Sequence, residues 1–141
     1  MAKEIYFYSK SKKYSWLSNF YPVYFKLNNR NWPTVEHYFQ AMKTENIIDQ
    51  ERIRCLEEPK LAKHLGRSVE LRPDWEEIKE DVMRDALYAN FTQSEKLKEK
   101  LLATGDAILH ENSPYDKYWG VHGKDRLGIL LMELREKLKG E

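Results

Sequence analysis

The chain has 141 residues, with 24 Lys and Arg against 23 Asp and Glu, so its formal net charge is +1. This length predicts a single domain over residues 1–141. The near-neutral charge argues against an extended basic surface for nucleic acid and against an acidic tail. Aromatic residues make up 13% of the chain, which excludes a disordered protein.

The sequence shows no sign of a membrane or secreted protein. No apolar run approaches the roughly 18 residues of a membrane span, and the first residues lack the apolar stretch of a secretory signal. Cys55 is the single cysteine, so no internal disulfide can form. We therefore expect a soluble, cytoplasmic protein.

Aromatic residues cluster in the first quarter of the chain, where short extended segments are expected. Residues 6–8 predict one such segment, and the alternation of apolar and polar residues over 23–27 predicts a half-buried strand. Asn28 and Asn29 both tolerate left-handed backbone, so a hairpin that returns through Arg30 to Trp32 is expected. Residues 16–22 show no clean period and indicate an ordered aromatic loop.

After Pro33 the apolar spacing becomes helical. It predicts helices over residues 35–42, 47–56, 59–66, 75–91, 95–102 and 126–138, with N-caps at Thr34, Asp74, Ser94 and Asp125. Between the last two helices the chain is irregular, apart from a short strand expected at Ile108-Leu109. These elements predict a mostly helical α+β domain with a small aromatic-rich N-terminal sheet or hairpin.

The helix after Pro33 carries the first candidate for chemistry. Glu36, Gln40 and Lys43 are spaced i, i+4 and i+7, so they form one polar stripe beside the apolar one. These are ordinary surface residues, and a Glu in the first turn also complements the helix dipole. The neighbouring aromatic loop is, however, a setting that can bury and tune a carboxylate.

The long segment from Thr104 to Arg126 is the second candidate, because ordered long loops in compact domains often carry function. Asp116 is a candidate second carboxylate, although loop aspartates commonly serve as turn formers. The pair Trp119-Gly120 indicates a ring beside a place where another group approaches the backbone closely.

Several kinds of site find no support. His37, His64, His110, His122 and Cys55 show no metal-ligand spacing, so no metal site is expected. The serines lie in no nucleophile elbow, and Gly123-Lys124 lacks the spacing of a phosphate-binding loop. No cofactor is therefore expected.

Several segments together resemble the YbiA-like family, also called NADAR, and the resemblance runs from about Tyr6 to Arg135. The matching segments are Phe7-Tyr8-Ser9, Leu17-Ser18-Asn19-Phe20, Trp32 to Ala41 with Lys43, Asp74-Trp75-Glu76, Val82-Met83, Leu102 to Gly105, Asp116 to Gly120 and Leu127 to Arg135. The stretch around Glu36 is the most specific of them.

This resemblance implies a mostly helical fold and an N-glycosidase that hydrolyses the C–N bond between a ribose and a nitrogenous group. It implies that Glu36 is the catalytic carboxylate and that Trp75 and Trp119 line the ligand. We expect further substrate contacts from the matching segments and from two candidate phosphate-binding cations, giving the set Tyr8, Ser9, Asn19, Phe20, Gln40, Lys43, Gly120 and Arg135. The chain departs from the family after Trp119-Gly120, where its loop is shorter and poorer in glycine. Asp125 also stands where the family carries Asn, so no phosphate or base contact is assigned to Val121–Arg126.

Two substrate classes follow from the resemblance, and a third interpretation is a binding protein without catalysis. One branch of the family acts on ribosylamino-pyrimidine phosphates made early in riboflavin synthesis, and this is the expected substrate. The alternatives are removal of ADP-ribose from guanine, with nucleic acid only as a modified substrate, and a non-catalytic pocket for ADP-ribose or a nucleotide. In each case residues 17–20, the start of the Glu36 helix, Trp75 and Trp119 are expected to converge on one pocket. The oligomeric state is left open.

Overall fold

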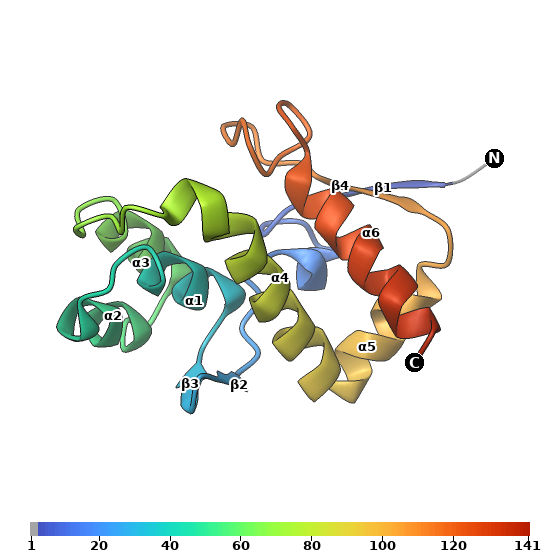
Figure 1. The fold of residues 1–141 in the computed structure, drawn as a ribbon. Coiled ribbons are helices and arrows are strands. Elements are labelled where there is room, and N and C mark those ends of the chain that lie inside the picture. Colours follow the sequence, from blue (N-terminus) through green and yellow to red (C-terminus); the bar gives the residue numbers. More distant parts are fainter. Residues whose placement is uncertain (1–2) are drawn as a thin grey trace. The chain divides into compact units, whose positions relative to one another are not determined.

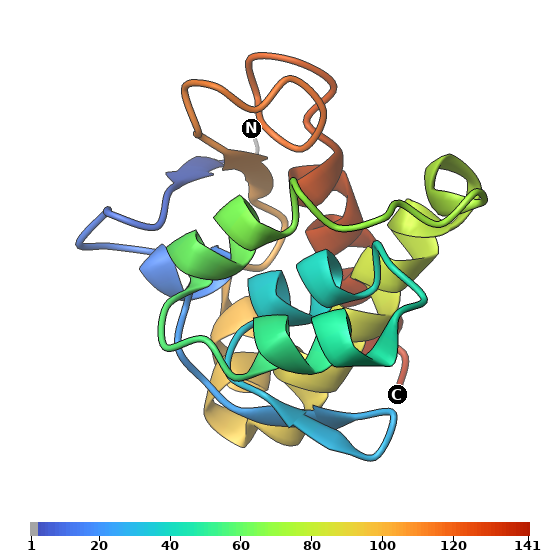
Figure 2. The same cartoon turned by 90° about the vertical axis from the view of Figure 1, so that its left-hand side faces the viewer.

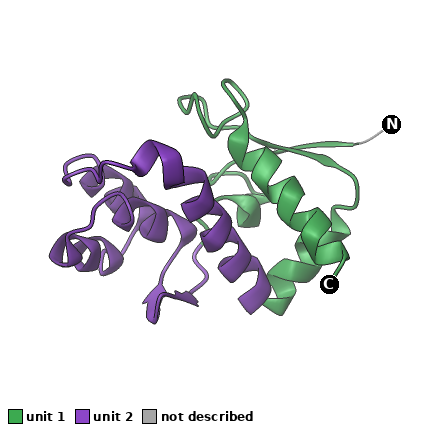
Figure 3. Ribbon diagram, viewed as in Figure 1, with its two compact units in different colours: residues 1–21, 94–141 green, residues 22–93 purple. Residues whose placement is uncertain are grey.

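The computed structural model describes residues 3–141. The chain is divided into two compact units (Figure 3). Unit 1 combines both ends of the chain, up to Tyr21 and from Ser94 onward, and unit 2 is Pro22–Gln93. Within residues 3–141, no helix combines the length and apolar character that crossing a bilayer requires.

Unit 1 is built around a short parallel sheet that joins distant parts of the sequence. Strand β1 (Glu4–Phe7) pairs with β4 (Ile108–Glu111), and Ile5 lies opposite Leu109 in the register. Helix α6 (Arg126–Lys139) packs against β4 and α5 (Glu95–Ala103), and η1 (Ser15–Leu17) is a single 3₁₀ turn. The loop between β4 and α6, orange in Figure 1, extends beyond the end of α6.

Unit 2 places one short helix at the centre of the others. Helix α1 (Val35–Ala41) contacts α2 (Ile47–Arg54), α3 (Pro59–Leu65) and the long α4 (Trp75–Gln93). A hairpin of β2 (Phe25–Leu27) and β3 (Arg30–Trp32) leads into α1, and Figure 2 shows it below the three short helices. Every residue of α1 is buried, so its polar side chains are enclosed rather than solvated.

Most of the local predictions are confirmed, and the fold is mostly helical α+β. Asn28 and Asn29 adopt φ angles of 55° and 62°, as the predicted hairpin turn requires. The side chains of Thr34 and Ser94 cap α1 and α5. Asp125 is the N-cap residue of α6, as predicted, but its side chain makes no bond to the helix and its carboxylate bonds to His110.

The predicted N-terminal sheet or hairpin is confirmed in the β2–β3 hairpin, and β1 belongs to a second sheet that the sequence did not indicate. The strands of the described residues form two separate two-stranded sheets, and only the β2–β3 hairpin is local. Strand β1 pairs instead with β4, about a hundred residues later in the chain. Parallel strands always need such a crossover, so this pairing leaves no signal in the neighbouring sequence.

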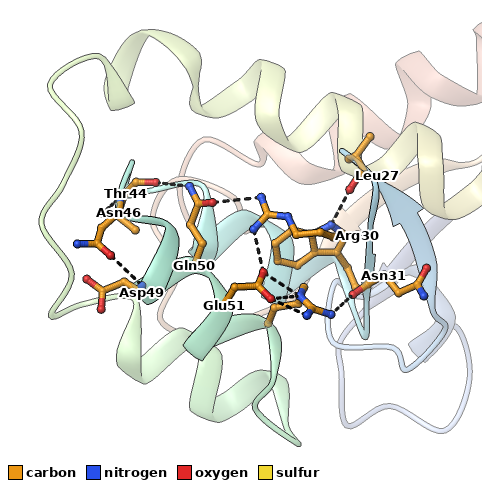
Figure 4. A network of polar contacts seen from close by, with 10 residues as sticks. Leu27, Arg30, Asn31, Thr44, Asn46, Asp49, Gln50 and Glu51 are labelled. Atoms are coloured by element: carbon orange, nitrogen blue, oxygen red, sulfur yellow. Dashed lines mark hydrogen bonds and ion pairs between the residues drawn. The ribbon is translucent and has the colours of Figure 1, made fainter.

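A polar network ties the hairpin to α2 (Figure 4). The Glu51 carboxylate accepts hydrogen bonds from Arg30 at 3.0 Å and from Arg54 at 2.6 Å. Arg30 also donates to Gln50, whose amide in turn donates to the Thr44 carbonyl. The hydrogen bonds from Arg54 and Arg30 lower the pKa of Glu51 to about 2. The loop that follows α1 is thereby connected to the hairpin that precedes it.

We expect Glu51→Gln to lower the free energy of unfolding by about 1 kcal/mol at neutral pH, since the carboxylate is partly exposed and such pairs are partly screened. The folded pKa lies below the unfolded value, so this contribution is complete above about pH 4.5. It is lost as the pH falls through about 2. Urea denaturation at low and high salt measures it, with Glu57→Gln, an exposed carboxylate after α2, as the control. An equal loss at low and high salt would contradict an ionic origin.

Candidate functional site

The first turn of α1 is fixed by a buried histidine. The Thr34 hydroxyl accepts a hydrogen bond from the backbone N–H of His37, which caps the helix. The His37 ring is fully buried, with Nδ1 2.8 Å from Thr34 Oγ1 and Nε2 2.9 Å from the carbonyl oxygen of Leu56. A carbonyl only accepts, so Nε2 carries the proton and Nδ1 accepts from the hydroxyl.

This arrangement suits a neutral imidazole. Burial lowers the pKa of His37, and the hydrogen bond to Leu56 opposes that shift only in part. The ring therefore serves as an uncharged link between α1 and the segment after α2. Its place next to Glu36 in the sequence means that the same link sets the position of the Glu36 backbone.

Glu36 directly precedes His37 in the helix and is 7% exposed. Its Oε2 accepts a hydrogen bond of 2.6 Å from Nε2 of Gln40, which is one helical turn further on and 4% exposed. The polar stripe predicted from the i, i+4 spacing is therefore real, but it is enclosed by protein. The surface interpretation of these two residues is wrong, because α1 is surrounded by neighbouring helices.

Lys43 and Trp75 lie around Phe39 in the same unit. Nζ of Lys43 is 5.9 Å from the centre of the Phe39 ring, and the Trp75 ring meets Phe39 edge-on at 5.0 Å. Lys43 is half-buried, and its backbone carbonyl accepts from Arg72. Trp75 is 5% exposed, so the contact that the structure shows for its ring is with the core of unit 2.

Asp116, Trp119 and Gly120 belong to the β4–α6 loop of unit 1. One carboxylate oxygen of Asp116 accepts from the backbone N–H groups of Tyr118 and Trp119, at 3.0 and 2.8 Å, which is the turn-forming arrangement. The close backbone approach predicted at Gly120 exists inside the loop: a Cβ there would lie 2.8 Å from the carbonyl oxygen of Asp116 and 2.8 Å from a carboxylate oxygen of Glu111. The Trp119 ring is half-buried beside Tyr118.

The remaining predicted site residues are also in unit 1. Tyr8 and Ser9 follow β1, while Asn19 and Phe20 follow η1, and all of these side chains are half-buried. Arg135 on α6 is 4% exposed and donates to the hydroxyl of Thr104 at the end of α5. A cation at this place complements the helix C-terminus, which gives Arg135 a structural contact. Its predicted contact with substrate stays a prediction.

The sequence did not indicate one polar cluster that the structure contains. His110 on β4 bonds through Nδ1 to Asp125 and lies 3.3 Å through Nε2 from Glu4, with Tyr6 stacked on its ring. Partial burial lowers the pKa of His110, but the bonds to Asp125 and Glu4 outweigh that effect and raise it above the ordinary value. The cluster depends on the β1–β4 pairing, so no local motif could have revealed it.

The structure thus gathers Glu36, Gln40, Lys43 and Trp75 around α1 in unit 2, whereas the predicted residues of the aromatic segments and the long loop belong to unit 1. The convergence of the two sets on one pocket stays a prediction. Over residues 3–141, no group of three or more His, Cys, Asp or Glu side chains is placed to hold a metal ion.

Comparison with known proteins identifies the family of this chain. The NADAR domain matches residues 6–139. The chain belongs to the NADAR family. The family resemblance seen in the sequence is thereby confirmed, and the segment with Glu36 and the loop with Trp119 both lie within the NADAR match.

Two of the relatives of this NADAR chain are N-glycosidases by name, and a third is named for riboflavin biosynthesis. The N-glycosidase YbiA of Escherichia coli is 48% identical over 138 residues, which cover 94% of this chain and 86% of that protein. An N-glycosidase of Nostoc punctiforme is 38% identical, and the match covers 96% of this chain and 92% of that protein. A riboflavin biosynthesis protein of Vibrio vulnificus is 38% identical, and the match covers 99% of this chain and 40% of that protein. The solution structure of Escherichia coli YbiA superposes with a TM-score of 0.90 at 47% identity, covering 99% of this chain and 87% of that chain.

The lowered pKa of His37 makes a prediction about acid stability. Below about pH 6.5 the unfolded chain binds more proton at this residue than the folded chain does, because the folded pKa is lowered. The contribution of His37 to the free energy of unfolding therefore falls as the pH is lowered through that range. We expect His37→Gln to flatten this pH dependence and to cost about 1–3 kcal/mol near pH 7.5, because one amide cannot replace both ring nitrogens and leaves either the Thr34 hydroxyl or the Leu56 carbonyl without its buried partner.

Urea denaturation at several values between pH 7.5 and 5 measures both effects. The exposed residue His64 on α3 provides the matched control, and we expect His64→Gln to keep the wild-type slope. If the free energy of unfolding of His37→Gln changes with pH as steeply as that of wild type, the buried imidazole does not control acid stability.

Proposed function

We propose that this chain is an N-glycosidase that hydrolyses ribosylamino-pyrimidine phosphates from early riboflavin synthesis. Water adds to the anomeric carbon, the C–N bond breaks, and the products are the free pyrimidine amine and ribose 5-phosphate. The names of the Escherichia coli and Nostoc punctiforme relatives support the reaction class, and the name of the Vibrio vulnificus relative supports the pathway.

The buried Glu36 carboxylate is the observation that carries this proposal. Breaking an N-glycosidic bond passes through a ribose with oxocarbenium character, so a carboxylate near the anomeric carbon stabilises positive charge or activates water. Glu36 is 7% exposed, and a charge that is shielded from water interacts more strongly with a developing opposite charge. The 2.6 Å bond from Gln40 holds the carboxylate in a defined orientation before substrate arrives.

Other residues are proposed to bind the substrate. Lys43 supplies a cation for the phosphate, and the aromatic faces of Trp75 and Trp119 stack the leaving base. Asp116 is the candidate second carboxylate, whose turn-forming bonds would fix its position. Arg135, Tyr8, Ser9, Asn19, Phe20 and Gly120 complete the proposed substrate contacts.

A substrate panel on the purified protein tests the assignment. We expect ribose 5-phosphate to be released from a ribosylamino-pyrimidine phosphate. Release of ADP-ribose from ADP-ribosylated guanine in DNA would instead place the chain among the enzymes that act on modified nucleic acid. Tight binding of ADP-ribose without turnover of either substrate would show a binding module.

The central mutation is Glu36→Gln, which keeps the size of the side chain and removes its charge. We expect turnover to fall by on the order of 10²–10⁴-fold, as is usual for a positioned acid or base. If Glu36 served only the helix dipole, the change would cost roughly 0.3–1 kcal/mol of stability and leave turnover near wild type. A melting curve and a steady-state rate on the same variant separate these outcomes.

Glu45→Gln is the matched control, because Glu45 is an exposed carboxylate shortly after α1. It should keep both the melting temperature and the rate. A folded Glu36→Gln protein with turnover within about threefold of wild type, far from the loss expected for acid–base catalysis, would remove Glu36 from the mechanism.

The absence of metal-ligand spacing in the sequence leads to a separate prediction. Turnover should be unchanged after treatment with excess EDTA, because the proposed chemistry relies on a carboxylate. The rate is measured before and after chelation. Loss of turnover that is restored by a divalent ion would overturn this part of the proposal.

A further inference from the structure

The Glu36–Gln40 pair has a fixed polarity. An ionised carboxylate only accepts hydrogen bonds, so the amide of Gln40 has to present its nitrogen to Glu36. Nε2 of Gln40 donates over 2.6 Å, the length of a strong charge-assisted bond. This orientation sends the other end of the amide, Oε1, away from Glu36 and toward α3.

Oε1 of Gln40 lies against Gly66, the C-cap of α3. This oxygen is buried and has no hydrogen-bond partner. A Cβ at Gly66 would overlap Oε1 and would lie 2.9 Å from Cδ of Gln40. Gly66 itself has a φ of −59°, which any residue adopts, so glycine is required here for space and not for its backbone freedom.

The two ends of the Gln40 amide are therefore set by different neighbours. Glu36 orients the nitrogen, and the missing side chain of Gly66 leaves room for the oxygen. A larger residue at position 66 would push the amide off the carboxylate, and the flexible Gln40 side chain could move without disturbing the backbone of α3. The acceptor end of Gln40 faces Gly66, which leaves the donor end as the part that acts on the site.

We propose that Gln40 is a positioning residue for the Glu36 carboxylate and that Gly66 is the residue whose small size permits it. This inference rests on the proposed role of Glu36 in N-glycosidic hydrolysis. It assigns to Gln40 a function exerted through Glu36, in place of the direct substrate contact that the sequence suggests. It also gives a role to a glycine outside the polar stripe of α1.

A double-mutant cycle tests the proposal. Gln40→Ala removes the amide that donates to Glu36, and Gly66→Ala displaces this amide without removing it. We expect each variant to lower kcat by on the order of 10- to 100-fold, with little change in KM, because small displacements of a reacting group cost that much. Gly66→Ala combined with Gln40→Ala should be no slower than Gln40→Ala alone, since the overlapping Oε1 and Cδ atoms are gone and only the 3.1 Å approach to Cβ of residue 40 remains.

A second cycle links the pair to the carboxylate. Glu36→Gln combined with Gln40→Ala should be no slower than Glu36→Gln alone if Gln40 acts through Glu36. Gly140→Ala is the matched control: Gly140 is also a helix C-cap with an ordinary φ of −87°, and a Cβ there would lie 3.6 Å from its nearest neighbour. This control should keep wild-type kcat and stability.

Multiplicative losses in either cycle, or wild-type kcat in a folded Gly66→Ala protein, would overturn the proposal. An NMR measurement keeps the test independent of turnover. We expect the side-chain amide protons of Gln40 to exchange slowly with solvent in wild type and Gly140→Ala, and quickly in Gly66→Ala. Failure of the wild-type protein on every substrate would reject the proposed function, while retained slow exchange in Gly66→Ala would reject the positioning role of Gly66.

Discussion

The buried imidazole of His37 determines where α1 begins, and the candidate site depends on that position. The ring accepts from the Thr34 hydroxyl and donates to the Leu56 carbonyl, so one uncharged side chain connects the N-cap of α1 to the segment after α2. Helix α1 spans only Val35–Ala41, which is too short to be stable by itself. Its position therefore comes from this link and from packing against α2, α3 and α4. Any rotation of the helix would move Glu36 and Gln40 together, because they occupy successive turns of the same face.

Two carboxylates of unit 2 show how differently a buried or half-buried charge can be used. Glu51 is held by two guanidinium groups, which lower its pKa to about 2 and fix the hairpin on α2. Glu36 is held by the amide of Gln40, a neutral donor. The Gln40 amide adds no charge of its own, and its short bond fixes the orientation of the carboxylate. The first arrangement stabilises the fold, and the second is suited to a transition state with oxocarbenium character.

Local elements were predictable from the sequence wherever a few adjacent residues decide them. The hairpin follows from Asn28-Asn29, and the start of α1 follows from Thr34, because both depend on the backbone preferences of single residues. The N-glycosidase family could be inferred because the stretch around Glu36 is continuous in sequence. The β1–β4 pairing and the His110 cluster were not predictable, since they join residues about a hundred positions apart. The sequence left the burial of Glu36 open, because the polar spacing of α1 is also that of a surface helix while the neighbouring aromatic loop favours a buried carboxylate.

Gly66 illustrates why the support of a candidate site is harder to infer than the site itself. In the sequence it marks the end of a helix, and it does end α3. Its φ of −59° shows that the helix end does not require glycine there, so the reason for this residue has to be its neighbour. That neighbour is Gln40, whose unpartnered oxygen fills the space where a side chain would otherwise stand. A buried acceptor without a partner costs free energy, and the compensating gain is the strong bond that the same amide donates to Glu36. The free-energy cost of the unpartnered Gln40 oxygen beside Gly66 is thus a consequence of the amide orientation that the Glu36 carboxylate imposes.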